Sequence, residues 1–217
     1  MENQAISELF LYWNRLRAGK PAPKRKEIEP MDIRTYLADT FILEKGLREE
    51  ATFRLAGTRV CAIFGRELKN FTFYSLFCAT DLSIVKRLIQ SCFKEKSVSM
   101  VSFEGTSKSE RTLGFDCIFL PLDGEGESDR IFGAIFSNGK PFWLGADIIV
   151  DCKVTSVRVV DPDKEFLFLN NRPSVPVPPM RPVLNELRQH GVKNNVTLFN
   201  GKRVGHLTVI HGGLSDA

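Results

Sequence analysis

The stretch that decides the fold is FILEKGLREEATFRLAGTRVCAIFGREL, residues 41–68. It begins with FILE, whose first three residues are apolar, and continues, after a charged loop, with ATFRLA, residues 51–56, in which apolar and polar side chains alternate. A period of two residues is typical of an antiparallel strand with one buried face. The stretch therefore predicts two short strands, and it places Phe53 and Leu55 on the buried face, opposite Arg54.

A glycine ends the second predicted strand. Gly57 is free to adopt a positive φ, so we expect a turn there that a side chain at this position would oppose. Residues 60–68 carry a second glycine, Gly65, and predict a tight helical turn. The alternation leaves two arrangements open for Arg54, which either lies in solvent or pairs with a carboxylate such as Glu44 on the neighbouring strand.

The order of these elements resembles a PAS domain, and more closely the PAS-like family of alphaproteobacterial regulators. The residues that carry the resemblance are Tyr12-Trp13, Arg17, Pro23, Ile28-Glu29-Pro30, Asp32-Ile33, Leu37, Phe41, Phe53 to Thr58 and Phe64 to Leu68. They cover roughly residues 10–137 of the chain. The resemblance implies a sensory or protein-interaction module, and it names no ligand.

One long helix and three more strands complete the predicted core. The helix begins after an N-cap at Thr80 or Asp81, continues to Phe93, and carries apolar residues on one face. Three stretches predict strands separated by turns rich in Gly, Ser and Asp. These stretches are residues 97–104, 111–122 and 130–136. The expected fold is α+β, a PAS-like five-stranded antiparallel sheet with flanking short helices.

The chain divides into three parts. Residues 1–39 predict an N-terminal amphipathic helix and a connector, and residues 40–150 form the PAS-like core. Residues 151–217 form a C-terminal extension. Within it, residues 153–160 and 165–169 predict two strands on either side of a turn.

A proline-rich linker interrupts the extension. Five of the eleven residues from Arg172 to Pro182 are proline, which cannot join the interior of a sheet. We therefore expect the chain from about Arg172 onward to be dispensable for folding.

The N-terminal helix has an apolar stripe that must pack on something. Its members are Ile6, Leu9, Phe10, Trp13 and Leu16, whereas Glu8, Arg15 and Arg17 fall mostly on the other side. Two partners are open, the sheet of the same domain and the same helix of a second chain. In many PAS domains such a helix packs on its twin, so the resemblance implies a homodimer with this stripe as its interface.

Apolar residues between the predicted helices and sheet are the candidate lining of a ligand pocket. They are Phe53, Leu55, Phe64, Phe73, Phe77, Phe115, Cys117 and Phe119. A small apolar ligand would fit such a lining.

Catalytic and metal-binding motifs are missing from the sequence. It contains no G-x-G-x-x-G, P-loop, G-x-S-x-G or H-E-x-x-H, so we expect no enzyme. His190, His206 and His211 lie in the extension, which disfavours a haem held by a core histidine and leaves too few ligands for a metal site. The residues around Cys78 do not resemble the motif of flavin photosensors, which disfavours covalent flavin photochemistry.

Composition restricts the location and the partners. No apolar run reaches the length that spans a bilayer, and five cysteines without a C-x-x-C suit a reducing compartment, so we expect a cytoplasmic protein without membrane contact. The net charge is +4, but the basic residues are scattered and no aromatic platform accompanies them. A nucleic-acid partner is therefore not expected.

Together these observations predict a non-catalytic regulatory module, a bacterial signalling adaptor that acts through protein–protein interaction under the control of a ligand or partner. Binding would shift the population of two arrangements of the N-terminal helix against the sheet. The alternative is a small-molecule sensor whose main event is the binding of a ligand in an apolar PAS pocket.

Overall fold

The computed structural model describes residues 4–46, 50–124 and 129–163, and the backbone of residues 175–176, 202–204 and 207–209. The chain divides into two compact units, Met1–Pro179 and Met180–Ala217. The second unit contains a hairpin of β8 (Lys202–Val204) and β9 (Leu207–Val209). The strand predicted at residues 165–169, most of the proline-rich linker and the three histidines lie outside the described residues.

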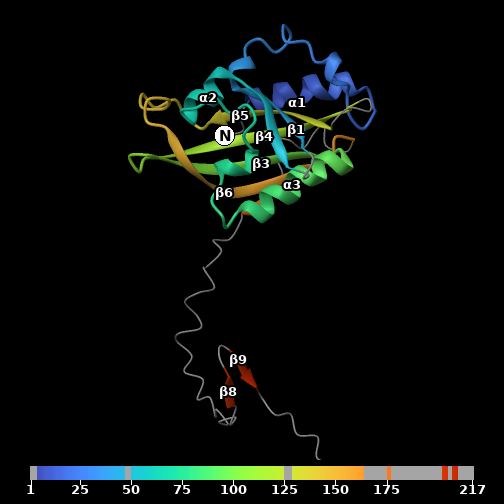
Figure 1. The fold of residues 1–217 in the computed structure, drawn as a ribbon. Coiled ribbons are helices and arrows are strands. Elements are labelled where there is room, and N and C mark those ends of the chain that lie inside the picture. Colours follow the sequence, from blue (N-terminus) through green and yellow to red (C-terminus); the bar gives the residue numbers. More distant parts are fainter. Residues whose placement is uncertain are drawn as a thin grey trace, which may run out of the picture. The chain divides into compact units, whose positions relative to one another are not determined.

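An antiparallel sheet forms the centre of the first unit. Its strands are β1 (Thr40–Lys45), β2 (Ala51–Ala56), β3 (Val98–Ser107), β4 (Thr112–Leu122), β5 (Arg130–Ser137) and β6 (Ile149–Val160). They lie side by side in the order β2-β1-β5-β4-β3-β6, and the two-residue β7 (Val175–Pro176) pairs with β6 (Figure 1). The predicted class, α+β with an antiparallel sheet, is confirmed.

The number of strands in that prediction was wrong, because the residues that the structure describes form a sheet of six long strands and not five. β6 belongs to the sheet and pairs with β3 from Val98 to Ser107. The physical reason is the edge of β3, which would otherwise present a row of unpaired backbone groups. Sequence patterning identifies β6 as a strand but does not show which edge it covers.

Helices cover both faces of the sheet. The elements are α1 (Gln4–Arg17), η1 (Arg25–Glu27), η2 (Leu37–Asp39), α2 (Thr58–Ile63), η3 (Phe73–Leu76) and α3 (Leu82–Glu95), where η denotes a 3-10 helix. α2, η3 and α3 bury their apolar residues in one core cluster with one face of the sheet. α1 and the connector after it form a second cluster with the opposite face.

Asp81 precedes α3 but does not cap it through its side chain. Its carboxylate Oδ2 instead accepts the backbone N–H of Val154 on β6 at 2.6 Å. The predicted helix and its N-cap position at Asp81 are therefore confirmed, but the Asp81 side chain does not hydrogen-bond to the first turn of the helix. The carboxylate joins the start of α3 to β6.

The apolar stripe of α1 packs on the sheet of its own chain. Ile6, Leu9, Phe10 and Trp13 are at most 2% exposed, and Leu16 is half-buried against the same cluster. The indole Nε1 of Trp13 donates to the carbonyl of Pro121 on β4 at 2.8 Å.

The sequence left two partners open for this stripe, and the structure shows that it packs on the sheet of the same domain. In this arrangement these side chains are not exposed to a second chain. Formation of a homodimer itself stays a prediction.

Gly57 is required for a reason other than the predicted one. Its φ of −67° and ψ of 156° are accessible to any residue, so the expected conformational strain was wrong. A Cβ atom at Gly57 would instead collide with the carbonyl oxygens of Leu37 and Ala38. The glycine allows η2 to approach the start of α2. The predicted turn at Gly65 does use a positive φ, of 63°.

We expect Trp13→Ala to destabilise the protein by about 3–5 kcal/mol, because it removes a fully buried side chain and leaves a cavity. Urea unfolding followed by circular dichroism measures the change. Leu11→Ala is the matched control on the same helix, since Leu11 is 44% exposed, and it should change stability by less than about 0.5 kcal/mol. A Trp13→Ala protein of unchanged stability would contradict the packing of α1 on the sheet.

We expect Gly57→Ala to lower the free energy of unfolding by about 1–3 kcal/mol, because the new methyl group overlaps backbone atoms that cannot rotate away. Gly46→Ala serves as the control, since a Cβ there would meet the carbonyl oxygen of Glu50 at an ordinary 3.4 Å. Equal thermal denaturation midpoints for the two variants would show that η2 moves freely.

Candidate functional site

The structure brings seven of the eight predicted pocket residues into one core cluster. Phe53, Phe64, Phe73, Phe77, Phe115, Cys117 and Phe119 are all buried there. Leu55 does not join them, because its side chain is 51% exposed.

A β-bulge explains the position of Leu55. Ile42 of β1 pairs with Leu55 and Leu43 pairs with Phe53, so Arg54 is an extra residue between the two pairs. An inserted residue changes which face the following side chains occupy. The strict alternation that the sequence suggested therefore stops at Arg54.

The buried rings of the predicted pocket lining contact one another. The Phe73 ring lies 5.2 Å from Phe119 and 5.5 Å from Phe77, measured between centroids. It also lies 5.6 Å from both Phe41 and Phe53. Separations of this size are those of aromatic side chains in direct contact. Phe73 is thus the centre of a packed aromatic cluster.

Two residues that the sequence analysis did not select complete this cluster. Phe41 contacts Phe53 and Phe119, and Phe103 stacks on Phe115 at 5.2 Å. Both lie on strands and face the helices, so the period-two pattern of their strands contains the signal that would have identified them.

A surface groove runs along β6 on the side of α3. One hollow of about 550 Å³ is lined by Ile84 and Leu88 of α3 and by Val157 and Val159 of β6, with Arg87 and Lys94 among its charged residues. A second hollow of about 450 Å³ lies where α1, α3 and β6 end. Glu95 and Val159 line both hollows, so we treat them as one groove and call it the β6 groove.

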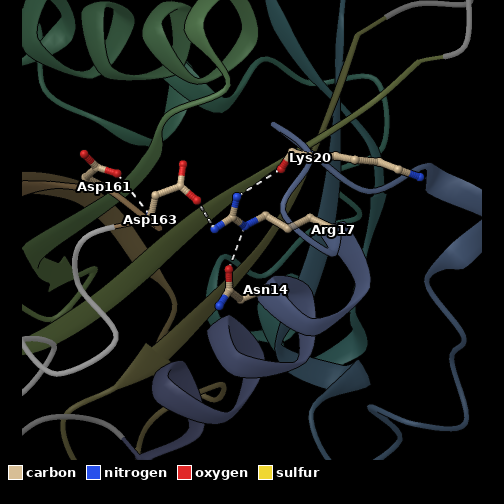
Figure 2. Close-up of polar contacts among 5 residues, drawn as sticks. All are labelled: Asn14, Arg17, Lys20, Asp161 and Asp163. Atoms are coloured by element: carbon tan, nitrogen blue, oxygen red, sulfur yellow. Dashed lines mark hydrogen bonds and ion pairs between the residues drawn. The ribbon is translucent and has the colours of Figure 1, made fainter.

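Arg17 lies at one end of the β6 groove, and Figure 2 shows its contacts. Its Nε donates to Oδ1 of Asn14 at 2.6 Å, and its Nη1 donates to the carbonyl of Lys20 at 3.0 Å. Its Nη2 donates to Oδ1 of Asp163 at 2.7 Å. The guanidinium carbon lies 5.7 Å from the centre of the Trp13 ring. The end of α1 is thereby joined to the end of β6.

The burial of Arg17 corrects an expectation from the sequence. Arg17 was expected mostly on the polar side of the helix, but its side chain is only 5% exposed. The signal was present in the spacing, because Arg17 follows Phe10 by seven residues and Trp13 by four, and so shares their face. The resemblance named Arg17 but gave it no role.

Arg54 adopts the second of its two predicted arrangements, in which it pairs with Glu44 on the neighbouring strand. Its Nε lies 4.0 Å from Oε2 of Glu44, and its side chain is 61% exposed. Glu44 also accepts a hydrogen bond from Arg130 at 3.2 Å. The pairing on the neighbouring strand is confirmed, and an exposed pair of this kind contributes little to stability.

Burial makes the core thiols poor nucleophiles. It raises the pKa of Cys117 well above its ordinary value, and it also raises the pKa values of Cys92 and Cys152. Among the residues that the structure describes, no three His, Cys, Asp or Glu side chains gather as a metal site would require. In the same part of the chain no helix has the length and apolar character needed to cross a membrane.

Comparison with known proteins identifies the family. The sequence model of a family described as "PAS domain" matches residues 1–136, more than half of the chain, and the chain belongs to this family. PAS domains form a family of signal-sensing modules. No curated protein matches the chain.

Among solved structures, the LOV protein of Rhodobacter sphaeroides is similar to this chain. The identity is 12% and the TM-score 0.40, over 64% of this chain and 70% of that one.

We expect iodoacetamide at about pH 8 to modify the half-buried Cys78 and, more slowly, Cys61, whose pKa burial raises, and to leave Cys92, Cys117 and Cys152 unmodified in the folded protein. The reactive species is the thiolate, which burial disfavours. Mass spectrometry of tryptic peptides measures the labelling, and all five thiols should react in denaturant. Rapid labelling of Cys117 in the native state would show that the aromatic cluster opens to solvent.

Proposed function

We propose that this PAS domain is a non-catalytic signalling adaptor of the alphaproteobacterial PAS-like type, which acts by binding another protein. The observation that supports this function is the aromatic cluster. Phe73 and the rings around it occupy the interior where a ligand was predicted. An interior filled by its own side chains leaves the surface as the place where a signal is received or transmitted.

The β6 groove has the composition of a protein-binding surface. Val157 and Val159 lie in it together with Ile84 and Leu88, and charged residues surround this apolar floor. Val159 is 52% exposed, although valine is among the residues most often buried. An apolar centre with a polar rim is the usual arrangement of an interface.

The mechanism that we propose is a population shift. The β6 groove is formed by three elements, α1, α3 and β6, and Arg17 joins the first to the last. A partner that binds the groove more tightly in one arrangement of α1 and β6 favours that arrangement. The surface presented to the next protein then changes with occupancy of the groove.

A small-molecule sensor is the second candidate, and one observation favours it. Ser99 on β3 is fully buried, and its Oγ has no hydrogen-bond partner among the described residues. It pairs across the strands with Phe119, which belongs to the aromatic cluster. A buried hydroxyl without a partner costs about 1–3 kcal/mol, which a ligand atom that accepts its hydrogen bond would offset.

Native mass spectrometry and an absorbance spectrum of the purified protein separate these two functions. An adaptor should show the mass of the 24.5 kDa chain, or a multiple of it, without added mass. A stoichiometric small molecule that is released on denaturation would overturn the adaptor in favour of the sensor.

Crosslinking in the native cell tests the adaptor directly. Val159→Glu places a charge in the β6 groove and should abolish the crosslink to the partner. Val150→Glu is the matched control, because Val150 is also exposed on β6 but lines a different hollow. Equal crosslinking of both variants would show that the partner binds elsewhere.

A further inference from the structure

Arg17 is a buried cation that is held in place by groups close to it in the chain. Its contacts with Asn14, with the carbonyl of Lys20 and with the Trp13 ring all come from α1 and the turn after it. These contacts orient the guanidinium group, and none of them involves a residue of β6. None of them neutralises its charge, because an amide, a carbonyl and an indole carry no net charge.

The neutralising group is the carboxylate of Asp163, which lies 146 positions away in the sequence. The Asp163 side chain is 71% exposed, whereas the Arg17 side chain is 5% exposed. The Asp163 backbone N–H donates to Oδ1 of Asp161 at 3.1 Å within the turn after β6. The Asp163 side chain is therefore held mainly by the ion pair, whereas Arg17 is also held by packing and by hydrogen bonds within its own helix and turn. Displacement of the pair would thus move Asp163 and leave Arg17 in place.

A buried arginine without a counter-charge is an unfavourable state, so the site favours any carboxylate that reaches it. The planar guanidinium group matches the geometry of a carboxylate better than an ammonium group does. The adjoining hollow of about 450 Å³ has walls that include Pro21, Val160 and Pro162. It has room for an acidic side chain together with an apolar neighbour.

We propose that Arg17 and this end of the β6 groove form a binding site for an acidic residue in an extended peptide segment of a partner, and that Asp163 occupies the site in cis. This inference rests on the proposed adaptor function and names the chemistry of its partner. Binding of the partner exchanges one carboxylate for another on the same guanidinium group.

The segment around Asp163, which occupies the site in this chain, indicates which peptide sequences would bind there. Asp163 comes from a short turn, Asp161-Pro162-Asp163, which follows directly after a β-strand and has valines before it. A partner segment with apolar residues beside an Asp or Glu presents the same groups. Glu95, Lys96 and Asp161 also line the hollow, so its charge is mixed and does not form the continuous positive surface that a nucleic-acid backbone requires.

The exchange has a consequence for the chain after β6. Asp163 attaches the end of β6 to α1, so a partner that displaces it releases this attachment. The two carboxylates compete for one site, so conditions that release Asp163 from Arg17 strengthen binding of the partner. Asp163 acts as a tethered competitor with an effective concentration on the order of millimolar, which keeps the free site occupied.

The test is a two-dimensional NMR titration that follows the Nε–H signal of Arg17 in the full-length protein. The probe is an acetylated and amidated peptide that copies residues 159–165 of the chain, VVDPDKE. The Asp163→Ala protein should bind this peptide about tenfold more tightly than the wild type does, because the tethered competitor is gone. The same peptide with Asp163→Asn should bind markedly more weakly to both proteins.

Two protein variants serve as controls. Asp151→Ala removes an exposed carboxylate from the same strand and leaves Asp163 on Arg17, so it should bind the peptide as the wild type does. Arg17→Lys, added to Asp163→Ala, loses the fork geometry and should lose the binding, which is followed in this variant on the indole Nε1–H signal of Trp13, whose ring lies beside residue 17. If either variant of Asp163 or Arg17 does not fold, the comparison of the Asp and Asn peptides on the wild type still decides the question.

Equal affinity of the wild type and Asp163→Ala for the peptide, or equal affinity of the two peptides, overturns the proposal. That failure differs from failure of the adaptor function. If Val159→Glu still abolishes the crosslink, the protein is an adaptor that does not use Arg17 as its anchor. A bound small molecule in the native mass spectrum would instead remove the adaptor function itself.

Discussion

Burial of the central strands on both faces is the constraint on which the rest of this structure depends. On β4, Phe119 faces the cluster with α2, η3 and α3, while Ile118 and Leu120 face the cluster with α1, and all three are fully buried. A sheet of this kind has no face that can be left in water, so α1 must pack on it. The apolar stripe of α1 is therefore buried against the sheet of its own chain.

β6 is joined to the helical layers on both faces of the sheet. This strand contacts the helical layer through the Asp81 carboxylate and through the pairing of Phe77 with Cys152, and it reaches α1 through Asp163 and Arg17. The aromatic cluster is dense, and a packed interior tolerates little rearrangement. A strand held by such contacts near the margin of the sheet responds more readily to a partner than a packed interior does.

Sequence patterns predicted most of the buried residues of the candidate site, but not the positions of Leu55 and Arg17. The aromatic residues were selected correctly as neighbours, because their spacing placed them on the inner faces of strands and helices. The prediction that Leu55 is buried was wrong, because the bulge at Arg54 depends on the register of β2 against β1. Arg17 was misplaced although its spacing after Trp13 put it on the buried face, because a charged residue is normally assigned to solvent. The counter-charge of the buried guanidinium group is Asp163, which no local pattern connects to Arg17.

By itself the sequence determined the strands and helices of the core, the α+β class and the absence of a catalytic motif, since each follows from local periodicity and residue type. Only the tertiary structure decided three further points. β6 covers the edge of β3, the rings around Phe73 contact one another across the core, and a buried Arg17 meets an exposed Asp163. Each is a contact between segments far apart in the chain, and such contacts are selected by complementary shape and charge, which a one-dimensional pattern does not record.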